Sequence, residues 1–221
     1  MAPVLYWFPV SPFARAIRYF LLASNIEHET KIVDLMKGEQ KTEEYKAINP
    51  HQKVPALVDG DLKLFESGAI IRYLALQYKS DLLPYHKGAA EAAVVDRELD
   101  WINGSIARAI NTINFEKKFK ALLGKGEPNK DAVAQNEQDL AGHLARANEL
   151  YFSESPEHVI GTTTTAADVL LGLYLAQASI SQIDLAPYPK LVTFYNAIRE
   201  TEAFKASHAE FFQFLASVAK N

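Results

Sequence analysis

The sequence predicts an α+β domain followed by an all-α domain, and three observations support this fold class. Residues 1–78 alternate β-forming runs with amphipathic helical segments in the order β-α-β-α-β-β-α. Residues 79–88, KSDLLPYHKG, combine Pro, Gly and mixed polarity as linkers do. From residue 89 onward the periodicity is helical, with little convincing strand. We therefore expect one domain at residues 1–80 and a second at residues 88–221.

In the first domain, residues 3–8 are rich in β-formers, and the Ser11-Pro12 pair that follows is typical of a helix start. A second strand is expected at 28–35 and a short helix or turn at 41–48. Because two strands bracket a long helix, they should form a parallel pair joined by a right-handed crossover. Strands at 54–58 and 62–65 flank Asp59-Gly60-Asp61, which predicts a β-hairpin, and Glu66-Ser67 then begin a helix.

In the second domain, apolar residues recur at three- and four-residue steps from Val95 to Ile113, which predicts a long amphipathic helix. The segment GKGEPNK at 124–130 ends this region, and a second long helix is expected at 131–152. Thr165 and Asp168 have a spacing close to that of a capping box, in front of the apolar run VLLGLYLA. Two further helices are expected at 190–200, after a break at Pro187 and Pro189, and near 202–219.

The composition excludes several classes of protein. Hydrophobic residues make up 48% and charged residues 23% of the 221 residues, so collagen-like and wholly disordered chains are excluded. The net charge of −4 argues against a strongly basic nucleic-acid binder. It is unevenly spread, with 10 basic and 9 acidic residues in 1–80, so an anionic small ligand suits the first part better than the second.

The complete absence of cysteine excludes disulfides, Cys-ligated zinc and thiol nucleophiles. No apolar run approaches the ~20 residues of a membrane span, and the N-terminus lacks the features of a signal peptide. We expect a cytoplasmic protein that binds neither membrane nor nucleic acid. The six histidines show no H-x-x-x-H pair, so no metal is expected, and the glycine-rich phosphate loops and G-x-S-x-G are missing.

Three segments of the first domain carry polar groups where a ligand could bind, although each also has a purely structural interpretation. Ser11 follows the first strand, where ligands of α/β units bind, but serine at this place commonly just caps the helix. A cis bond at Val54-Pro55 would turn the Val54 backbone toward a ligand, yet ~5–6% of X-Pro bonds in folded proteins are cis, and periodicity cannot choose. Glu66-Ser67 stand at a helix N-terminus that suits an anion, but capping alone explains them too.

Taken together, these segments resemble the glutathione-binding region of cytosolic glutathione transferases. The run from Asn49 to Gly60 (NPHQKVPALVDG), followed by Leu64 to Ile70 (LFESGAI), is long and specific for that family. FPVSPFARA at 8–16 looks most like the serine-dependent phi and theta classes. The resemblance extends over the whole chain and implies a thioredoxin-like N-terminal domain with an all-helical C-terminal domain.

The resemblance also implies roles for individual residues. Ser11 would be the catalytic residue, donating a hydrogen bond to the sulfur of glutathione and so favouring the thiolate. Val54, before a cis Pro55, would pair with the cysteinyl backbone of glutathione, and Glu66 and Ser67 would hold its γ-glutamyl ammonium and carboxylate. The glycine carboxylate would be met by the polar residues Lys53, Gln40 and Lys41.

The electrophile would bind between the domains, against side chains of the first strand's loop and of the first long C-terminal helix: Trp7, Phe8, Pro9, Phe13, Trp101, Ser105, Arg108, Thr112 and Phe115. Arg15, one turn below Ser11, would add positive potential near the sulfur or, more simply, form a structural salt bridge. Tyr6 precedes Ser11 by five residues and is expected to lie in the core or on the dimer side rather than to be catalytic. The absence of cysteine at this turn disfavours glutaredoxin or dehydroascorbate reductase chemistry.

The implied protein is a homodimeric glutathione transferase that detoxifies hydrophobic electrophiles, with glutathione as co-substrate and the reduction of organic hydroperoxides as a side activity. The alternative is a non-catalytic protein of the same fold, such as a subunit like elongation factor 1 gamma, a regulator or a ligandin-type binder. Ser11 in place favours the enzyme.

Overall fold

The computed structural model describes residues 2–218, and among these it contains a mixed four-stranded sheet and a series of helices. Strands β1 (Val4–Trp7), β2 (Glu29–Ile32), β3 (Ala56–Asp59) and β4 (Leu62–Phe65) have the spatial order β2-β1-β3-β4. Strand β2 is parallel to β1, whereas β3 is antiparallel to both β1 and β4. This is the thioredoxin-like arrangement, and the expected fold class is confirmed.

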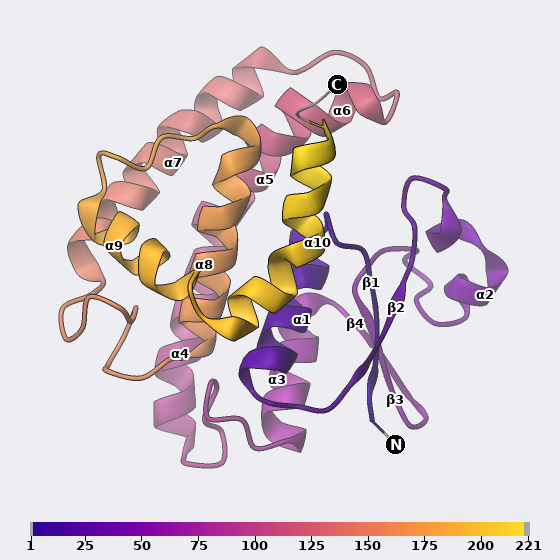
Figure 1. Cartoon of the computed structure of the whole chain (residues 1–221), viewed down its shortest axis with the longest axis horizontal. Coiled ribbons are helices and arrows are strands. Elements are labelled where there is room, and N and C mark those ends of the chain that lie inside the picture. The colour runs from indigo at the N-terminus through magenta and orange to yellow at the C-terminus, as the bar shows by residue number, and fades with distance from the viewer. Residues whose placement is uncertain (1, 219–221) are drawn as a thin grey trace. The chain divides into compact units, whose positions relative to one another are not determined.

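The helices of this sheet region are α1 (Pro12–Ala23), α2 (Glu43–Lys46) and α3 (Ser67–Gln77). Figure 1 shows α1 and α3 on one face of the sheet and the short α2 on the other side. Leu5, Ile17, Phe20 and Leu74 are fully buried in the resulting core. The hairpin between β3 and β4 turns at Gly60, whose φ of +59° is readily adopted by glycine.

The remaining helices are α4 (Ala89–Ile102), α5 (Arg108–Asn114), α6 (Lys120–Leu122), α7 (Lys130–Leu150), α8 (Ala166–Gln177), α9 (Pro189–Ile198) and α10 (Glu202–Val218). The long helix expected up to Ile113 contains a π-helical segment, Asn103–Ala107, and a second π-helical segment, Phe115–Phe119, follows α5. In the first of these, the Ser105 hydroxyl donates to the carbonyl of Trp101, a side-chain bond to the preceding turn that competes with the regular ladder.

Every residue of α8 is buried, as its apolar sequence predicts. Gly172 lets α8 approach α9 closely, because a Cβ at this position would lie 3.0 Å from the side chain of Ile198. The capping box predicted at the start of α8 is present. Asp168 Oδ2 accepts from the backbone N–H of Thr165 at 2.6 Å and from its hydroxyl at 2.8 Å.

By their internal contacts the described residues form two compact units. Residues up to Ala92 and those from Thr201 onward form the first, and Ala93–Glu200 form the second. Helix α10 therefore belongs to the sheet-containing unit, where it packs along α1. The domain boundaries expected at residues 80 and 88 stay a prediction.

Candidate active site at one end of the sheet

The strand register brings the three candidate segments of the sequence to the same end of the sheet. Tyr6 of β1 lies opposite Ala56 of β3, and Ala56 lies opposite Phe65 of β4. Ser11 therefore follows the end of β1, Val54-Pro55 precede the start of β3, and Glu66 follows the end of β4, all at the same end of the sheet. Since Trp7 is also paired with Ile32 in the parallel strand β2, the segment that continues to Gln40 and Lys41 starts from this end too.

Ser11 caps α1, and its hydroxyl oxygen accepts a hydrogen bond from the backbone N–H of Ala14 at 3.3 Å. The backbone N–H of Ser11 donates to the carbonyl of Phe8 at 3.0 Å, and the turn that results holds Ser11 in place after β1. The serine is half-buried, and among the described residues no group accepts its hydroxyl proton. Because a hydroxyl can accept and donate at once, Ser11 can cap the helix and still donate to an anion.

The Val54-Pro55 peptide bond is cis, as the resemblance implied. The β1–β3 register ends at the Tyr6–Ala56 pair, so the backbone of the buried Val54 lies beyond the paired residues. This position leaves Val54 available to pair with an extended peptide in the manner of an added strand.

Two buried residues that the sequence reasoning missed hold the loop before Val54. The hydroxyl of Tyr45 and the side-chain amide of Asn49 both donate to the carbonyl of Lys53, each at 2.7 Å. Burial raises the pKa of Tyr45 to about 12, so the phenol keeps the proton that it donates. The Asn49-Pro50 pair was the available signal for Asn49, whereas nothing in the local pattern marks Tyr45.

Glu66 has φ +70° and ψ 114°, a conformation that non-glycine residues rarely adopt. Its side chain is exposed and makes no hydrogen bond to the helix that follows, while Ser67 is the first residue of α3. Backbone strain of this kind, ~1–3 kcal/mol, is concentrated at ligand sites. The observed conformation therefore favours a binding role for Glu66 over a simple capping role.

The basic and amide residues predicted for the glycine carboxylate lie in two loops of the first unit. Gln40 and Lys41 are in a 3₁₀ turn at Glu39–Lys41, and Lys53 precedes Val54. Both lysines are exposed, and the Gln40 Oε1 atom is buried without a hydrogen-bond partner among the described residues. This oxygen is an acceptor, so Gln40 would have to meet a carboxylate through the N–H groups of its amide.

The residues predicted for an electrophile pocket are divided between the two units, and their grouping stays a prediction. Phe8 and Phe13 follow β1, and Phe13 is exposed. Ser105, Arg108, Thr112 and Phe115 follow one another on the helical run of the second unit. Thr112 donates its hydroxyl to the carbonyl of Arg108 at 2.9 Å, and Ser105 likewise donates to a helix carbonyl, so both hydroxyls can offer a ligand only their acceptor capacity.

Tyr6 is a strand residue with ring neighbours on the sheet. Its ring lies 6.1 Å from that of Tyr45, and the Lys31 ammonium lies 5.4 Å from its centroid. These contacts involve its ring, and the non-catalytic role expected for Tyr6 stays a prediction.

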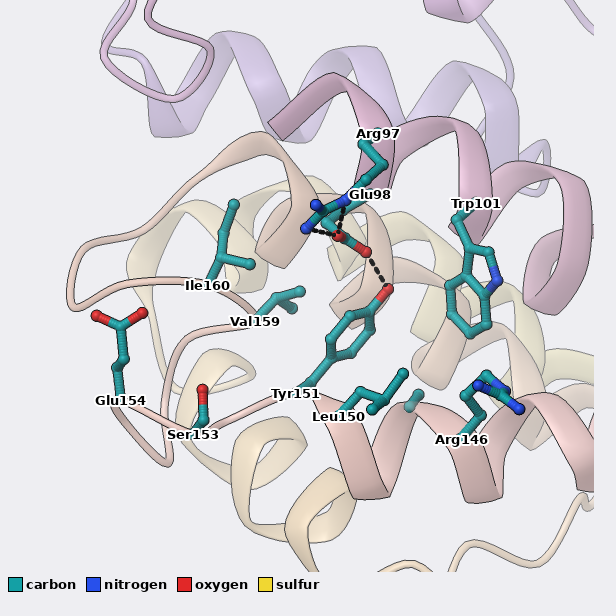
Figure 2. A pocket seen from close by; sticks show the side chains of 11 residues that line it. Arg97, Glu98, Trp101, Arg146, Leu150, Tyr151, Ser153, Glu154, Val159 and Ile160 are labelled. Carbon is teal, nitrogen blue, oxygen red and sulfur yellow. Dashed lines mark hydrogen bonds and ion pairs between the residues drawn. The ribbon is translucent and has the colours of Figure 1, made fainter. Parts of the chain in front are cut away.

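A cavity of about 460 Å³ lies within the second unit, and Trp101, one of the residues expected at the electrophile pocket, is among its lining residues (Figure 2). At its wall the hydroxyl of Tyr151 donates to Glu98 at 2.6 Å, and Arg97 forms an ion pair with the same carboxylate. Desolvation by burial and the adjacent Glu98 raise the pKa of Tyr151, which keeps this donor protonated. Because the buried carboxylate already has these two partners, the network accounts for itself without a ligand.

Within residues 2–218 no three His, Asp or Glu side chains gather as a metal site would require. In the same part of the chain, no helix has both the length and the apolar character to cross a membrane.

Comparison with known proteins identifies relatives of the chain. Residues 2–76 match the family model described as "Glutathione S-transferase, N-terminal domain". The chain is 36% identical over 152 residues to glutathione S-transferase F10 of Arabidopsis thaliana, which covers 67% of this chain and 68% of that protein. It is 30% identical over 192 residues to glutathione S-transferase D7 of Anopheles gambiae, covering 86% and 83% of the two chains.

Solved structures agree with these relatives. Glutathione S-transferase-I bound with lactoylglutathione superposes with a TM-score of 0.82 at 25% identity, covering 95% of this chain and 99% of that one. The apo form of human glutathione S-transferase T1-1 has the same TM-score and identity, covering 94% and 88%. The chain therefore belongs to the glutathione S-transferase family.

Proposed function

We propose that the protein is a glutathione transferase in which Ser11 stabilises the thiolate of glutathione. The observation that supports this proposal is the hydroxyl of Ser11, which accepts from Ala14 N–H and donates to no group among the described residues. A free thiol has a pKa near 8.5, so only a few per cent is ionised at neutral pH. Each unit by which the hydrogen bond lowers that pKa corresponds to ~1.4 kcal/mol of preferential thiolate stabilisation.

Glutathione would lie along the end of the sheet where the three segments meet. The backbone of Val54, before Pro55, would pair with the cysteinyl residue, and Glu66 would accept from the γ-glutamyl ammonium. Ser67 and the N-terminus of α3 would donate to the γ-glutamyl carboxylate. Lys53, Gln40 and Lys41 would meet the glycine carboxylate at the other end of the tripeptide.

The reaction is a nucleophilic attack by the sulfur. The thiol proton leaves to solvent, the thiolate forms a C–S bond with an electrophilic carbon, and that carbon releases its leaving group with the bonding electrons. The electrophile is proposed to be hydrophobic and to contact Phe8, Phe13, Ser105, Arg108, Thr112 and Phe115. The side chains of the helical unit would determine which electrophile binds, because the pockets of proteins with the same fold vary in such elements.

The test is Ser11→Ala, assayed with glutathione and 1-chloro-2,4-dinitrobenzene. We expect turnover to fall at least about tenfold, equivalent to ~1.4 kcal/mol in the barrier, while glutathione affinity stays within a few-fold. Asn129→Ala is the matched control, since Asn129 caps α7 by accepting from Ala132 N–H at 3.0 Å. Both variants lose an N-cap worth ~1 kcal/mol of stability, but only the first should lose turnover.

Unchanged turnover in Ser11→Ala would refute the serine mechanism. A larger loss in Tyr6→Phe than in Ser11→Ala would assign the hydrogen bond to the tyrosine instead. Tight glutathione binding without activity on several electrophiles would favour the non-catalytic alternative.

Two further properties are proposed because the chain belongs to this family. The first is reduction of organic hydroperoxides, in which two glutathione thiols supply two electrons, the O–O bond breaks, and an alcohol, water and glutathione disulfide form; cumene hydroperoxide is a suitable test substrate. The second is a cytoplasmic homodimer of the 24.6 kDa chain, which sedimentation would reveal as a doubled mass.

A further inference from the structure

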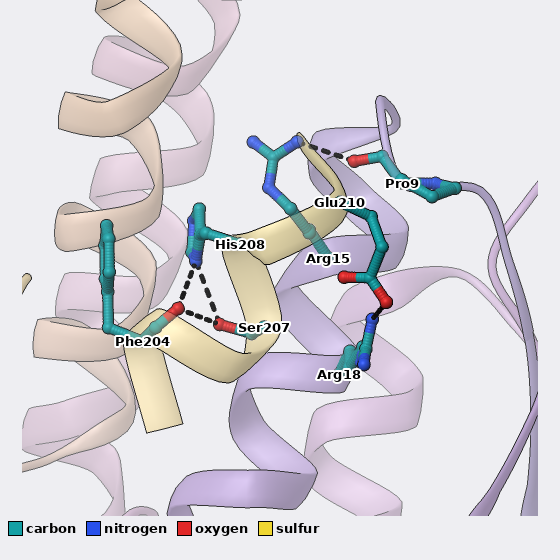
Figure 3. A network of polar contacts seen from close by, with 7 residues as sticks. All are labelled: Pro9, Arg15, Arg18, Phe204, Ser207, His208 and Glu210. Atoms are coloured by element: carbon teal, nitrogen blue, oxygen red, sulfur yellow. Dashed lines mark hydrogen bonds and ion pairs between the residues drawn. The ribbon is translucent and has the colours of Figure 1, made fainter. Parts of the chain in front are cut away.

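Helix α10, at the far end of the sequence, lies against the helix that Ser11 begins. Two arginines of α1, Arg15 and Arg18, face α10, where the polar side chains of Ser207, His208 and Glu210 lie close by (Figure 3). All of these residues belong to the same compact unit.

Arg15 is fully buried and joins α10 to the turn that carries Ser11. Its Nη1 atom donates to the carbonyl of Pro9 at 2.8 Å, inside the turn from Phe8 to Ser11 (Figure 3). Its guanidinium carbon lies 3.7 Å from the ring centroid of Phe211, a fully buried residue of α10. A guanidinium over an aromatic face at this distance is held by cation–π attraction, which is strongest where water is excluded.

Arg18 makes a parallel connection one turn further along α1. It forms an ion pair with Glu210 of α10 at 2.8 Å, and its guanidinium lies 4.2 Å from the ring of Trp7, the last residue of β1. Both arginines therefore contact α10 on one side and the chain just before Ser11 on the other.

The charged and titratable groups around Arg15 and Arg18 favour the contacts of these arginines with α10. His208 is buried, stacks on Phe204 at 4.0 Å, and lies edge-on to Tyr19 of α1. Burial, together with the positive charges of Arg15 and Arg18, lowers the pKa of His208 to about 2. A neutral imidazole adds no third positive charge beside the two arginines, and Glu210 supplies the negative charge on the same helix.

We propose that α10 is a positioning element for the catalytic turn and that Arg15, held over Phe211, is the positioning residue that fixes the Pro9 carbonyl and thereby Ser11. This inference rests on the proposed function of Ser11. It extends that function by making the precision of the thiolate hydrogen bond depend on the C-terminal helix. Small displacements of a group that stabilises charge have large effects on rate, so an indirect contact can control turnover.

The experiment compares Phe211→Leu with Phe212→Leu in the full-length protein. The first substitution removes the ring beneath Arg15. The second removes the neighbouring ring, which lies near Phe204 and His208 rather than under the guanidinium. For each variant we would measure the pKa of the thiol of bound glutathione by ultraviolet titration of the thiolate, kcat and KM, and the thermal unfolding midpoint.

We expect Phe211→Leu to raise the pKa of the bound thiol by roughly half a unit or more and to lower kcat about 3- to 10-fold near pH 6.5, with KM for glutathione within about twofold. Phe212→Leu should leave the thiol pKa at the wild-type value, whatever it does to the unfolding midpoint. Arg15→Lys, which keeps the charge but loses the flat stacked group, should reproduce the effect and serves if Phe211→Leu does not fold.

A thiol pKa in Phe211→Leu and Arg15→Lys equal to that of wild type would overturn the inference and leave a purely structural contact. Equal shifts in Phe211→Leu and Phe212→Leu would overturn it as well. The serine mechanism is judged separately: if Ser11→Ala leaves the thiol pKa unchanged, the proposed function has failed first and the positioning role has failed with it.

Discussion

Glu66 has a positive φ, a backbone conformation that strains a residue with a side chain but does not strain glycine. Its side chain is exposed at the start of α3 and forms no capping hydrogen bond with that helix. Ser11, by contrast, does cap its helix, through Ala14 N–H, and retains a proton to donate. For Ser11 the structural and the catalytic interpretation are therefore compatible. For Glu66 the strained backbone, with no capping bond in return, is what argues for a ligand.

Replacing the acid–serine pair should weaken the binding of glutathione without abolishing the chemistry. We expect Glu66→Gln and Ser67→Ala each to raise the dissociation constant about 5- to 30-fold, or ~1–2 kcal/mol, because each removes one charge-assisted hydrogen bond. Isothermal titration with glutathione measures the change, and kcat at saturation should stay near the wild-type value. Glu149→Gln, an exposed residue of α7, provides the same change of charge as a control. Unaltered affinity in both site variants would disprove the proposed binding map.

His208 should make the fold sensitive to acid. Its pKa is about 2 in the folded protein and near 6.5 in the unfolded chain, so between these values only the unfolded chain takes up the proton. Stability from this group is complete above about pH 6.5 and declines as the pH falls, by up to ~1.4 kcal/mol per pH unit.

The variant His208→Phe keeps the ring stacked on Phe204 and removes the titrating group. Urea unfolding between pH 7 and pH 4.5 should therefore show a shallower loss of stability in His208→Phe than in wild type. His51→Gln, which replaces an exposed histidine, is the control variant. Parallel pH profiles for wild type and His208→Phe would contradict the assignment.

At the scale of elements, the short-range signals were accurate. The Ser11-Pro12 start of α1, the turn at Gly60 and the start of α3 at Ser67 agree with the expectations from sequence. The long helix expected up to Ile113 is present, but its hydrogen bonding is π-helical at Asn103–Ala107, and a second π-helical segment, Phe115–Phe119, follows beyond it. Apolar periodicity averages over several turns and so does not register a local change in the backbone hydrogen bonds.

The capping box of α8 is expected to be a major determinant of stability in the second unit. Asp168 is fully buried and accepts from three donors, the backbone N–H groups of Val159 and Thr165 at 2.6 Å each and the Thr165 hydroxyl. Asp168→Ala should lower the free energy of unfolding by about 2–4 kcal/mol, because buried donors lose their partner. Chemical denaturation measures this loss. Asp131→Ala, in the exposed first turn of α7, should change stability by less than about 0.5 kcal/mol. Equal effects of the two substitutions would show that the box contributes little.

At the scale of the whole molecule, the glutathione site proposed at the end of the sheet belongs to the first unit, whereas the cavity bounded by Glu98 and Tyr151 belongs to the second. Hydrogen exchange followed by mass spectrometry distinguishes them. Saturating glutathione should slow exchange in peptides covering residues 8–15, 53–57 and 66–70, because binding suppresses local opening of the elements that it contacts. Peptides covering 153–160 at the cavity serve as the internal reference and should be unaffected. Protection confined to those peptides would transfer the glutathione site to the second unit.

The sequence alone was sufficient to predict the order of the elements and the residues that lie together at one end of the sheet. Ser11, Val54 and Glu66 each adjoin a strand whose limits can be inferred from local β-forming runs and turn residues, and the pairing of those strands then determines where the flanking residues lie. Local propensity and hydrophobic periodicity act over a few residues, so they can be recognised in the sequence without knowledge of the tertiary structure.

Only the tertiary structure revealed what holds those residues in place. The conformation of Glu66, the two donors on the Lys53 carbonyl, and the packing of Phe211 under Arg15 all depend on segments that are remote along the chain or on backbone angles that no side-chain pattern specifies. Helix α10 could be predicted as a helix from its own residues, but its place along α1 is decided by long-range packing, in which distant segments together bury apolar groups and pair charges.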